Sequence, residues 1–254
     1  LQQARLLAST GHTQEAIAAY DKLFSGNPPG AELASEYWNV VAKDPARRNA
    51  AINQLKKINT DNPGNTQLQA TLAQLLFQTE RRDEGFAVLQ EMAKSNSGRG
   101  QASDMWYEQI KDRPTSAASV SELQKYLSVF SDGDSVTAAR SQLEAQQKQL
   151  ADPTFRAKAE GLAAVDAGQG SKAVAELQKA VSANHTDSEA IGALGQAYSQ
   201  KGDRARAVAQ FEKAIALDPQ SDNRGKWDSL LKVNRYWFCL LYTSPSPRDT
   251  ERSR

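Results

Sequence analysis

The 254-residue chain has one cysteine, Cys239, and only two histidines and two methionines. A single cysteine excludes an internal disulfide and leaves the redox compartment undecided. Lysine plus arginine (31) and aspartate plus glutamate (30) almost cancel, so no overall field attracts phosphate backbones or anionic lipids. We therefore expect no nucleic-acid partner.

Long apolar runs are missing as well. No stretch of eighteen apolar residues occurs, so we expect this chain not to insert directly into a membrane. The chain opens LQQARLLAST, without an initiator methionine or a charged and then apolar leader. We expect it to be a piece of a longer protein.

Catalytic motifs are the third absence. The sequence has no phosphate-binding glycine loop and no HExxH, CxxC or GxSxG motif. We therefore predict that the chain is not an enzyme and that it has no catalytic, cofactor-binding or metal-binding residues.

What the sequence does contain is an internal period of about 34 residues. The unit that begins at Ser188 includes ALGQAYSQKGDRARAVAQFEKAIALDP, and its spacing of small, aromatic and proline residues is the tetratricopeptide pattern. Each such unit is a pair of antiparallel helices, and stacked units form a superhelix with a concave face. The predicted fold class is therefore all-α, a tetratricopeptide-repeat superhelical solenoid with an irregular helical insert.

The repeat pattern assigns packing roles within each unit. Gly195 and Ala207 are expected where the two helices approach closely, and Gly202 in the turn between them. Pro219 is expected to close the second helix, because proline lacks an amide hydrogen. The other predicted packing residues of the two C-terminal units are Leu194, Tyr198, Phe211, Ala214, Gly161, Ala173 and Leu177.

Earlier units match the pattern with departures. Complete units begin at Glu32 and Thr66, and the unit at Thr66 has Gly85 where alanine is usual and Glu80 where the turn glycine is usual. A truncated unit precedes them. Trp38 and Trp106 fall at the first-helix position that Leu194 occupies, and we expect both to pack in the core.

The interval from Gly100 to Pro153 breaks the period. Its apolar pattern predicts three helices, the first at Met105, Trp106 and Ile110 and the others over 120–130 and 136–150. The last two are separated by a polar break that we expect to act as a hinge. The hinge residues are Ser131, Asp132, Gly133 and Asp134. The predicted organisation is an N-terminal array (1–99), the insert and hinge (100–153), a C-terminal repeat pair (154–221), the start of a further repeat helix (222–238) and a tail (239–254).

The tail LLYTSPSPRDTERSR has no apolar period and crowds prolines, serines and arginines together. It resembles read-through from a cloning vector, so we expect residues 239–254 to be non-native.

Other residues that often form sites have structural explanations. His12 and His185 fall in predicted turns of different repeats, so we expect surface residues and not a metal pair. Asp83 and Glu84, like Asp132 and Asp134, lie in turns or at helix starts, where carboxylates serve as caps. Four arginines are expected on solvated faces of second helices: Arg81, Arg82, Arg204 and Arg206.

Several segments carry a more specific resemblance. INQLKKINTDNPGNTQLQATLAQLLFQTERRDEGFAVLQEMAKSN, YLSVFSDGDSV, the Ala193–Pro219 stretch and KWDSLLKVNRYW resemble the periplasmic repeat region of the bacterial cellulose synthase operon protein C family. The resemblance implies a periplasmic location, in a parent protein anchored by an outer-membrane barrel that lies outside this sequence. It also implies a scaffold that aligns the inner-membrane synthase with the export pore, with other proteins of the complex, nascent glucan or peptidoglycan as partners.

Two alternatives remain open at this point. A repeat scaffold of another exopolysaccharide exporter would share the same physics. A peptide-binding co-chaperone module would need Lys, Asn and Arg along the first helices to hold a terminal carboxylate. The first helix of the Ser188 unit has different residues on its expected concave side, and they would bind an anion only weakly: Glu189, Gln196, Ser199 and Gln200.

Overall fold

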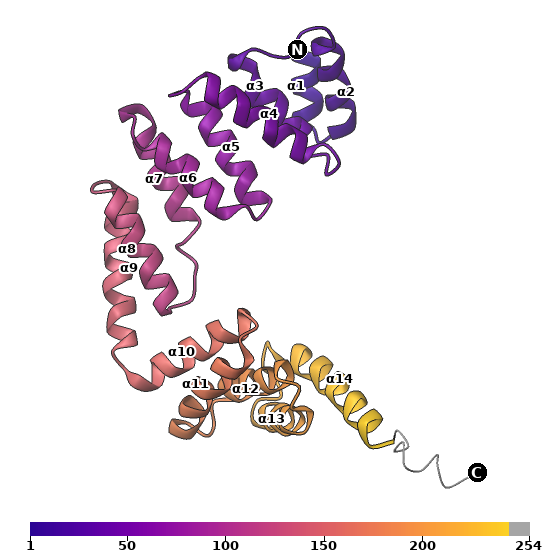
Figure 1. The fold of residues 1–254 in the computed structure, drawn as a ribbon, viewed down its shortest axis with the longest axis vertical. Coiled ribbons are helices and arrows are strands. Elements are labelled where there is room, and N and C mark those ends of the chain that lie inside the picture. Colours follow the sequence, from indigo (N-terminus) through magenta and orange to yellow (C-terminus); the bar gives the residue numbers. More distant parts are fainter. Residues whose placement is uncertain (244–254) are drawn as a thin grey trace, which may run out of the picture. The chain divides into compact units, whose positions relative to one another are not determined.

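The computed structural model describes residues 1–243, which form fourteen α-helices and contain no strand (Figure 1). The predicted all-α class is confirmed. The helices are α1 (Gln2–Ser9), α2 (Thr13–Phe24), α3 (Ala31–Val41), α4 (Arg48–Asp61), α5 (Thr66–Gln78), α6 (Arg82–Met92), α7 (Asn96–Glu108), α8 (Ala117–Val129), α9 (Asp134–Leu150), α10 (Pro153–Asp166), α11 (Gly170–Ala183), α12 (Ser188–Gln200), α13 (Arg204–Leu217) and α14 (Arg224–Thr243).

The helices divide into two compact units. The first unit comprises Leu1–Asp112 with Leu123–Arg140, and the second comprises Arg113–Glu122 with the chain from Ser141 onward. All three boundaries between the units along the chain fall inside the predicted insert at residues 100–153. The predicted hinge loop from Ser131 to Asp134 lies wholly within the first unit.

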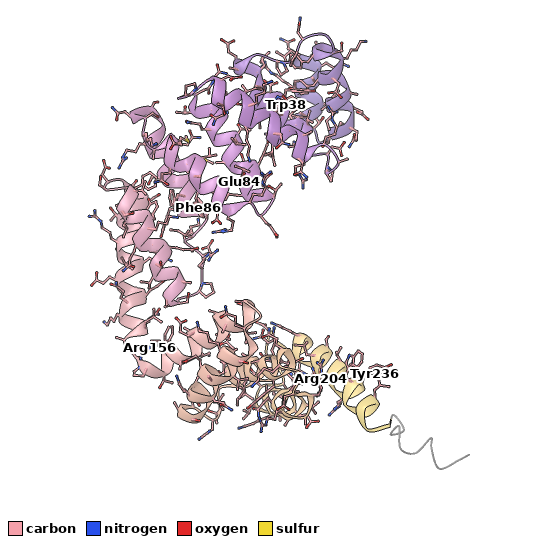
Figure 2. All side chains as sticks on the ribbon, in the orientation of Figure 1. Trp38, Glu84, Phe86, Arg156, Arg204 and Tyr236 are labelled. Carbon is pink, nitrogen blue, oxygen red and sulfur yellow. The ribbon has the colours of Figure 1, made fainter. Side chains whose placement is uncertain are left out.

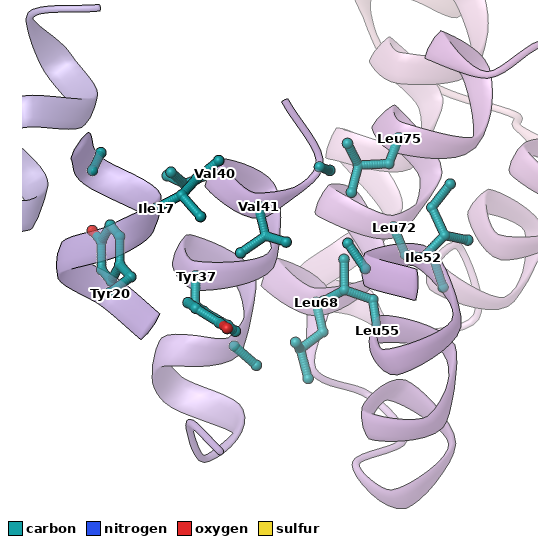
Figure 3. Packing of buried hydrophobic residues seen from close by; sticks show 14 of the residues in the cluster. Ile17, Tyr20, Tyr37, Val40, Val41, Ile52, Leu55, Leu68, Leu72 and Leu75 are labelled. Carbon is teal, nitrogen blue, oxygen red and sulfur yellow. The ribbon is translucent and has the colours of Figure 1, made fainter. Parts of the chain in front are cut away.

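The core of the first unit joins α1 to α5. Tyr20 on α2, Leu55 on α4 and Leu72 on α5 are almost fully buried, and Figure 3 shows Tyr20 at one side of this core, near Tyr37, and Leu55 and Leu72 at the other. Burying a side chain of this size stabilises the fold by about 1.5–3 kcal/mol. Because every helix covers the next, this part of the first unit has one continuous apolar core.

Two tyrosine–carboxylate–arginine sets tie α2 and α3 together. Asp21 accepts hydrogen bonds from Tyr37 (2.8 Å) and from Arg47 (2.6 Å). Glu36 accepts the corresponding bonds from Tyr20 and from Arg5 (2.7 Å). Burial, followed by the bond to Glu36, raises the pKa of Tyr20 to about 12. These paired contacts fix the register of the truncated first repeat against the second.

The second unit packs small residues against large ones at its helix crossings. A Cβ atom added at Gly161 would lie 2.5 Å from Leu177 Cγ, and one added at Gly195 would lie 3.0 Å from the Phe211 ring. The aromatic and aliphatic residues that the repeat pattern assigns to packing are all buried there. Close backbone approach is therefore the reason that these two positions carry glycine.

The turn between α5 and α6 adopts the conformation that glycine usually supplies. Glu80 has φ 59°, close to the φ of 80° at Gly202 in the equivalent turn of a later repeat. A side chain in this left-handed region costs roughly 1–2 kcal/mol. The departure from the repeat pattern at Glu80 thus changes the residue without changing the turn.

Two expectations from the sequence need correction: Trp38 packs against the core but is not fully buried, and three of the four arginines are not on solvated faces. Trp38 is only partly buried, because the neighbouring Tyr37 takes the core position on α3 and the Trp38 ring packs against its edge, 4.5 Å between centroids. Three of the four arginines expected on solvated faces are partly buried and bonded: Arg81 to Glu84, Arg82 to the Gln109 carbonyl and Arg204 to Asn234. Arg81 bonds within its own helix, whereas Arg82 and Arg204 satisfy acceptors of other helices, which a single-helix pattern does not reveal.

The insert is helical on both sides of its polar break, as expected. The observed α8 and α9 begin a few residues earlier than the predicted helices, and α7 begins at Asn96, before the predicted start of the insert. Arg99 on α7 donates to the Val129 carbonyl at the end of α8 (2.8 Å) and to the Ala93 carbonyl at the end of α6 (3.3 Å). One guanidinium therefore binds carbonyl groups at the C-terminal ends of two helices.

The last helix is longer than expected. α14 continues to Thr243, past the boundary predicted after Phe238. Its exposed face carries Val233, Tyr236 and Leu240, and Figure 2 marks Tyr236 among these outward side chains. The rest of the predicted tail, residues 244–254, lies outside the described residues.

Candidate interaction surface on the C-terminal repeats

A narrow groove crosses the first helices of three successive repeats in the second unit, α10, α12 and α14. We call it the α10–α12–α14 groove. It encloses about 70 Å³, room for single side chains of a partner. Its apolar lining is Leu162, Val165, Ala193 and Trp227, and its polar lining is Asp166, Glu189, Gln196, Asn223 and Lys226.

Trp227 lines the groove and packs α14 against α12. Its ring lies against Gly192 on α12, where an added Cβ would come within 2.2 Å of the indole Nε1. Only the absence of a side chain at Gly192 lets the indole lie there, and Trp227 is 3% exposed as a result. This close contact determines how near the third helix of the groove comes to the second.

A buried polar cluster holds the middle of α14, at Asn234. Asn234 is fully buried and donates through Nδ2 to Ser199 Oγ (3.0 Å), while its Oδ1 accepts from Arg204 (3.1 Å). Arg204, labelled in Figure 2, lies at the start of α13. Because a buried amide is stable only when its polar atoms are paired, these bonds select one register of α14.

The four residues expected on the concave side of α12 therefore separate into two pairs. Glu189 and Gln196 line the α10–α12–α14 groove. Ser199 accepts hydrogen bonds from Asn234 and Arg204, and Gln200 donates through Nε2 to the Val165 carbonyl (2.8 Å). The first pair faces the groove, where Glu189 is also bonded to Lys158, whereas the second pair connects neighbouring repeats.

The groove is not the cationic site that a terminal carboxylate needs. Lys158 on α10 lies between Glu189 (2.7 Å) and Asp187 (2.9 Å), which also caps α12. Burial lowers the pKa of the Lys158 ammonium, but the bonds to these two carboxylates outweigh it and hold the pKa above its ordinary value. Lys158 is thus charged and already neutralised by protein acids.

A larger cleft of about 470 Å³ lies between α10 and α11. Charged side chains dominate its walls, with Arg156 and Glu160 from α10 and Lys172, Glu176 and Lys179 from α11. Glu176 is paired with Lys179 (2.8 Å), and Glu160 accepts from the Ala117 amide at the start of α8 (2.8 Å). Because these charges are of both signs and partly paired with one another, the cleft presents no uniform field to a charged ligand.

The other residues considered as candidate sites lie outside the groove and the cleft. His12 and His185 are exposed in different turns, as expected. Among residues 1–243, no group of three His, Cys, Asp or Glu side chains is placed to hold a metal ion. Glu84 accepts from Arg81 (2.7 Å) and from Lys56, which ties α6 to α4. Within the same range, no helix combines the length and apolar character needed to cross a membrane.

Sequence reasoning missed most of the groove, namely the contributions of α10 and α14. One signal was present: Leu162 and Gln196, like Glu189 and Asn223, are separated by one repeat length, so stepping along the period finds equivalent lining positions. Trp227 likewise lies one repeat length after Ala193, but the period does not indicate that its ring packs on Gly192.

Residues 188–221 match the family model for the tetratricopeptide repeat. The chain is 70% identical over 240 residues to the cellulose synthase operon protein C of Escherichia coli K12, which covers 94% of this chain and 21% of that protein. It is 69% identical over 240 residues to the protein of the same name from Salmonella typhimurium, covering 94% of this chain and 20% of the relative.

A solved structure is also similar, a crystal structure of the flexible tandem repeat domain from a component of bacterial cellulose synthase. It matches with 62% identity and a TM-score of 0.55, over 59% of this chain and 62% of that one. The resemblance to cellulose synthase operon protein C and the tetratricopeptide fold are thereby confirmed. The chain spans about a fifth of the length of the curated relatives.

Proposed function

We propose that this chain is a non-catalytic periplasmic scaffold of a bacterial cellulose synthesis and export complex. In this role it links the inner-membrane synthase to the outer-membrane pore through contacts with other proteins of the complex. The observation that carries the proposal is the similarity to cellulose synthase operon protein C over almost the whole chain. A repeat solenoid supplies the extended surface that such a scaffold requires.

The α10–α12–α14 groove is the surface that we assign to a protein partner. Its walls come from three successive first helices, so an extended segment lying along it would contact every repeat of the second unit. Apolar floor residues and a polar rim are the usual composition of a recognition groove. A groove of about 70 Å³ suits the side chains of a peptide better than it suits a sugar ring.

A carboxylate-binding module of the co-chaperone type is disfavoured by Lys158. The ammonium that would hold a terminal carboxylate is already bonded to Asp187 and Glu189. A partner carboxylate would have to displace both protein acids from this cation and would meet their repulsion.

Site-specific photocross-linking in a cellulose-secreting bacterium tests the assignment. A benzoyl-phenylalanine residue at Gln196, in the parent protein, should form an adduct with another protein of the cellulose complex. The same residue at Ala175, exposed on the second helix α11, is the matched control and should not form that adduct. Adducts at Gln196 only with proteins unrelated to cellulose secretion, or equal adducts at both positions, would contradict the proposal.

A further inference from the structure

We propose that the α10–α12–α14 groove recognises an extended partner segment through a basic side chain, lysine or arginine. This inference deepens the proposed function and rests on its assignment of the groove to a protein partner. A carboxylate-binding repeat module has the opposite preference, because its groove binds an anionic group of the partner. Four features of the groove support it.

Acids outnumber bases at the groove. Asp166 and Glu189 line it, and Asp187 lies beside Glu189, whereas the nearby bases are Lys158 and Lys226. Lys158 is shared between Asp187 and Glu189 and therefore cannot neutralise both. Within residues 1–243 Asp166 forms no ion pair, so its carboxylate is free to bind a partner cation.

Asp166 is also the last residue of α10. The C-terminal end of a helix carries a partial negative charge, and a cation there is stabilised. The carboxylate and the helix end therefore act in the same direction. An anionic partner group at this place would be opposed by both.

The apolar walls match the stem of a basic side chain. Leu162 and Val165 line the groove from α10 together with Asp166, and Ala193 faces them from α12. Lysine and arginine bury their methylene stems on such surfaces while the charged end stays in water. Val165 and Ala193 are each less than 9% exposed and form the floor, so Leu162 supplies most of the apolar contact beside the exposed carboxylate of Asp166, within a volume of about 70 Å³.

The lining amides complete the fit to an extended backbone. Gln196 and Asn223 each offer a donor and an acceptor, the first from α12 and the second from the residue before α14. Such side chains can pair with the backbone of a peptide lying across α12 and α14. Gln196 and Asn223 would then bind the peptide backbone, while Asp166 would bind the basic side chain.

Three fluorescein-labelled octapeptides of the same serine–alanine background test the inference, with Lys-Lys, Gln-Gln or Glu-Glu at the centre. Fluorescence anisotropy with the whole chain at low ionic strength should rank their affinities Lys above Gln above Glu. Asp166→Asn should weaken the lysine peptide about two- to fivefold, the range for exposed ion pairs, and leave the glutamine peptide unchanged. Glu144→Gln, an acid on α9 away from the groove, is the matched control and should change neither.

Equal affinity for the three peptides, or binding to none of them, would overturn the basic-side-chain inference. So would an Asp166→Asn variant that keeps the full preference for lysine. Neither result affects the proposed function, because the cross-link from Gln196 does not depend on the charge of the partner. Conversely, a lysine preference without any cellulose-complex adduct at Gln196 would support this inference and contradict the scaffold.

Discussion

The indole of Trp227 lies against the bare backbone of Gly192, where an added Cβ would come within 2.2 Å of the indole Nε1. This one contact determines the spacing of α12 and α14 and with it the width of the groove. A glycine in mid-helix costs roughly 0.5–1 kcal/mol relative to alanine. The packing of Trp227 is what offsets that cost.

Gly192→Ala should therefore destabilise the second unit although alanine is the better helix former. Overpacking typically costs about 1–3 kcal/mol, which exceeds the gain in helix propensity. Urea denaturation followed by circular dichroism should show a lower midpoint. Gly225→Ala in α14 is the matched control, because an added Cβ meets nothing within 4 Å there and the midpoint should stay or rise slightly. A higher midpoint for Gly192→Ala would contradict the observed packing.

Glu80→Gly should stabilise the first unit. Glu80 has φ 59°, a conformation that glycine adopts without strain, so the substitution should add about 0.5–1 kcal/mol. Thermal melting of the two proteins measures the difference. Gln74→Gly, at an exposed position inside α5, should lower the melting temperature instead. Destabilisation by both substitutions would show that the turn at Glu80 is not strained.

Arg99→Met should loosen the first unit by about 1–2 kcal/mol. The substitution keeps an apolar stem but removes the hydrogen bonds to the Val129 and Ala93 carbonyls. Hydrogen exchange should report faster opening of the last turns of α6 and α8. Lys57→Ala, which removes a cation on α4, is the comparison and should leave these amides unaffected. Unchanged amide exchange in Arg99→Met would mean that the ends of α6 and α8 are stable without the hydrogen bonds from Arg99.

The stability of the first unit should fall in acid partly through Glu84. The hydrogen bonds from Arg81 and then Lys56 lower the pKa of Glu84 from its ordinary value of 4.5 to about 2. A carboxylate whose folded pKa is lowered stabilises the fold above its unfolded pKa, and that stability is lost as the pH falls toward the folded pKa. The contribution of Glu84 should therefore be complete at neutral pH and disappear between about pH 4.5 and 2.

Melting temperatures of the wild-type chain and of Glu84→Gln across this pH range provide the test. The variant should be the less stable protein at pH 7, and the difference should vanish near pH 2. Glu32→Gln, at an acid in the first turn of α3 that forms no ion pair among residues 1–243, loses only its interaction with the helix dipole and should differ from the wild type much less than Glu84→Gln. A difference that persists at pH 2 would assign the effect of Glu84 to packing and not to its charge.

The repeat, the helices and most of the close crossings can be predicted from the amino-acid sequence alone. The recurring positions of Gly161, Gly195 and Phe211 are local patterns within one helix pair, and a period of about 34 residues repeats the same requirement in each unit. The segments that resemble cellulose synthase operon protein C also indicated which proteins the chain is similar to. Both conclusions depend on residues that are near in the chain or separated by one fixed period.

Only the tertiary structure decided which faces meet. Trp227 lies on Gly192, Arg99 closes two helix ends, and Lys158 is neutralised by acids of the next repeat. Each of these contacts joins residues at spacings that no helical or repeat period relates. Side-chain packing between separate helices sets such distances, because an overlap or an unpaired polar group raises the free energy only in the assembled core.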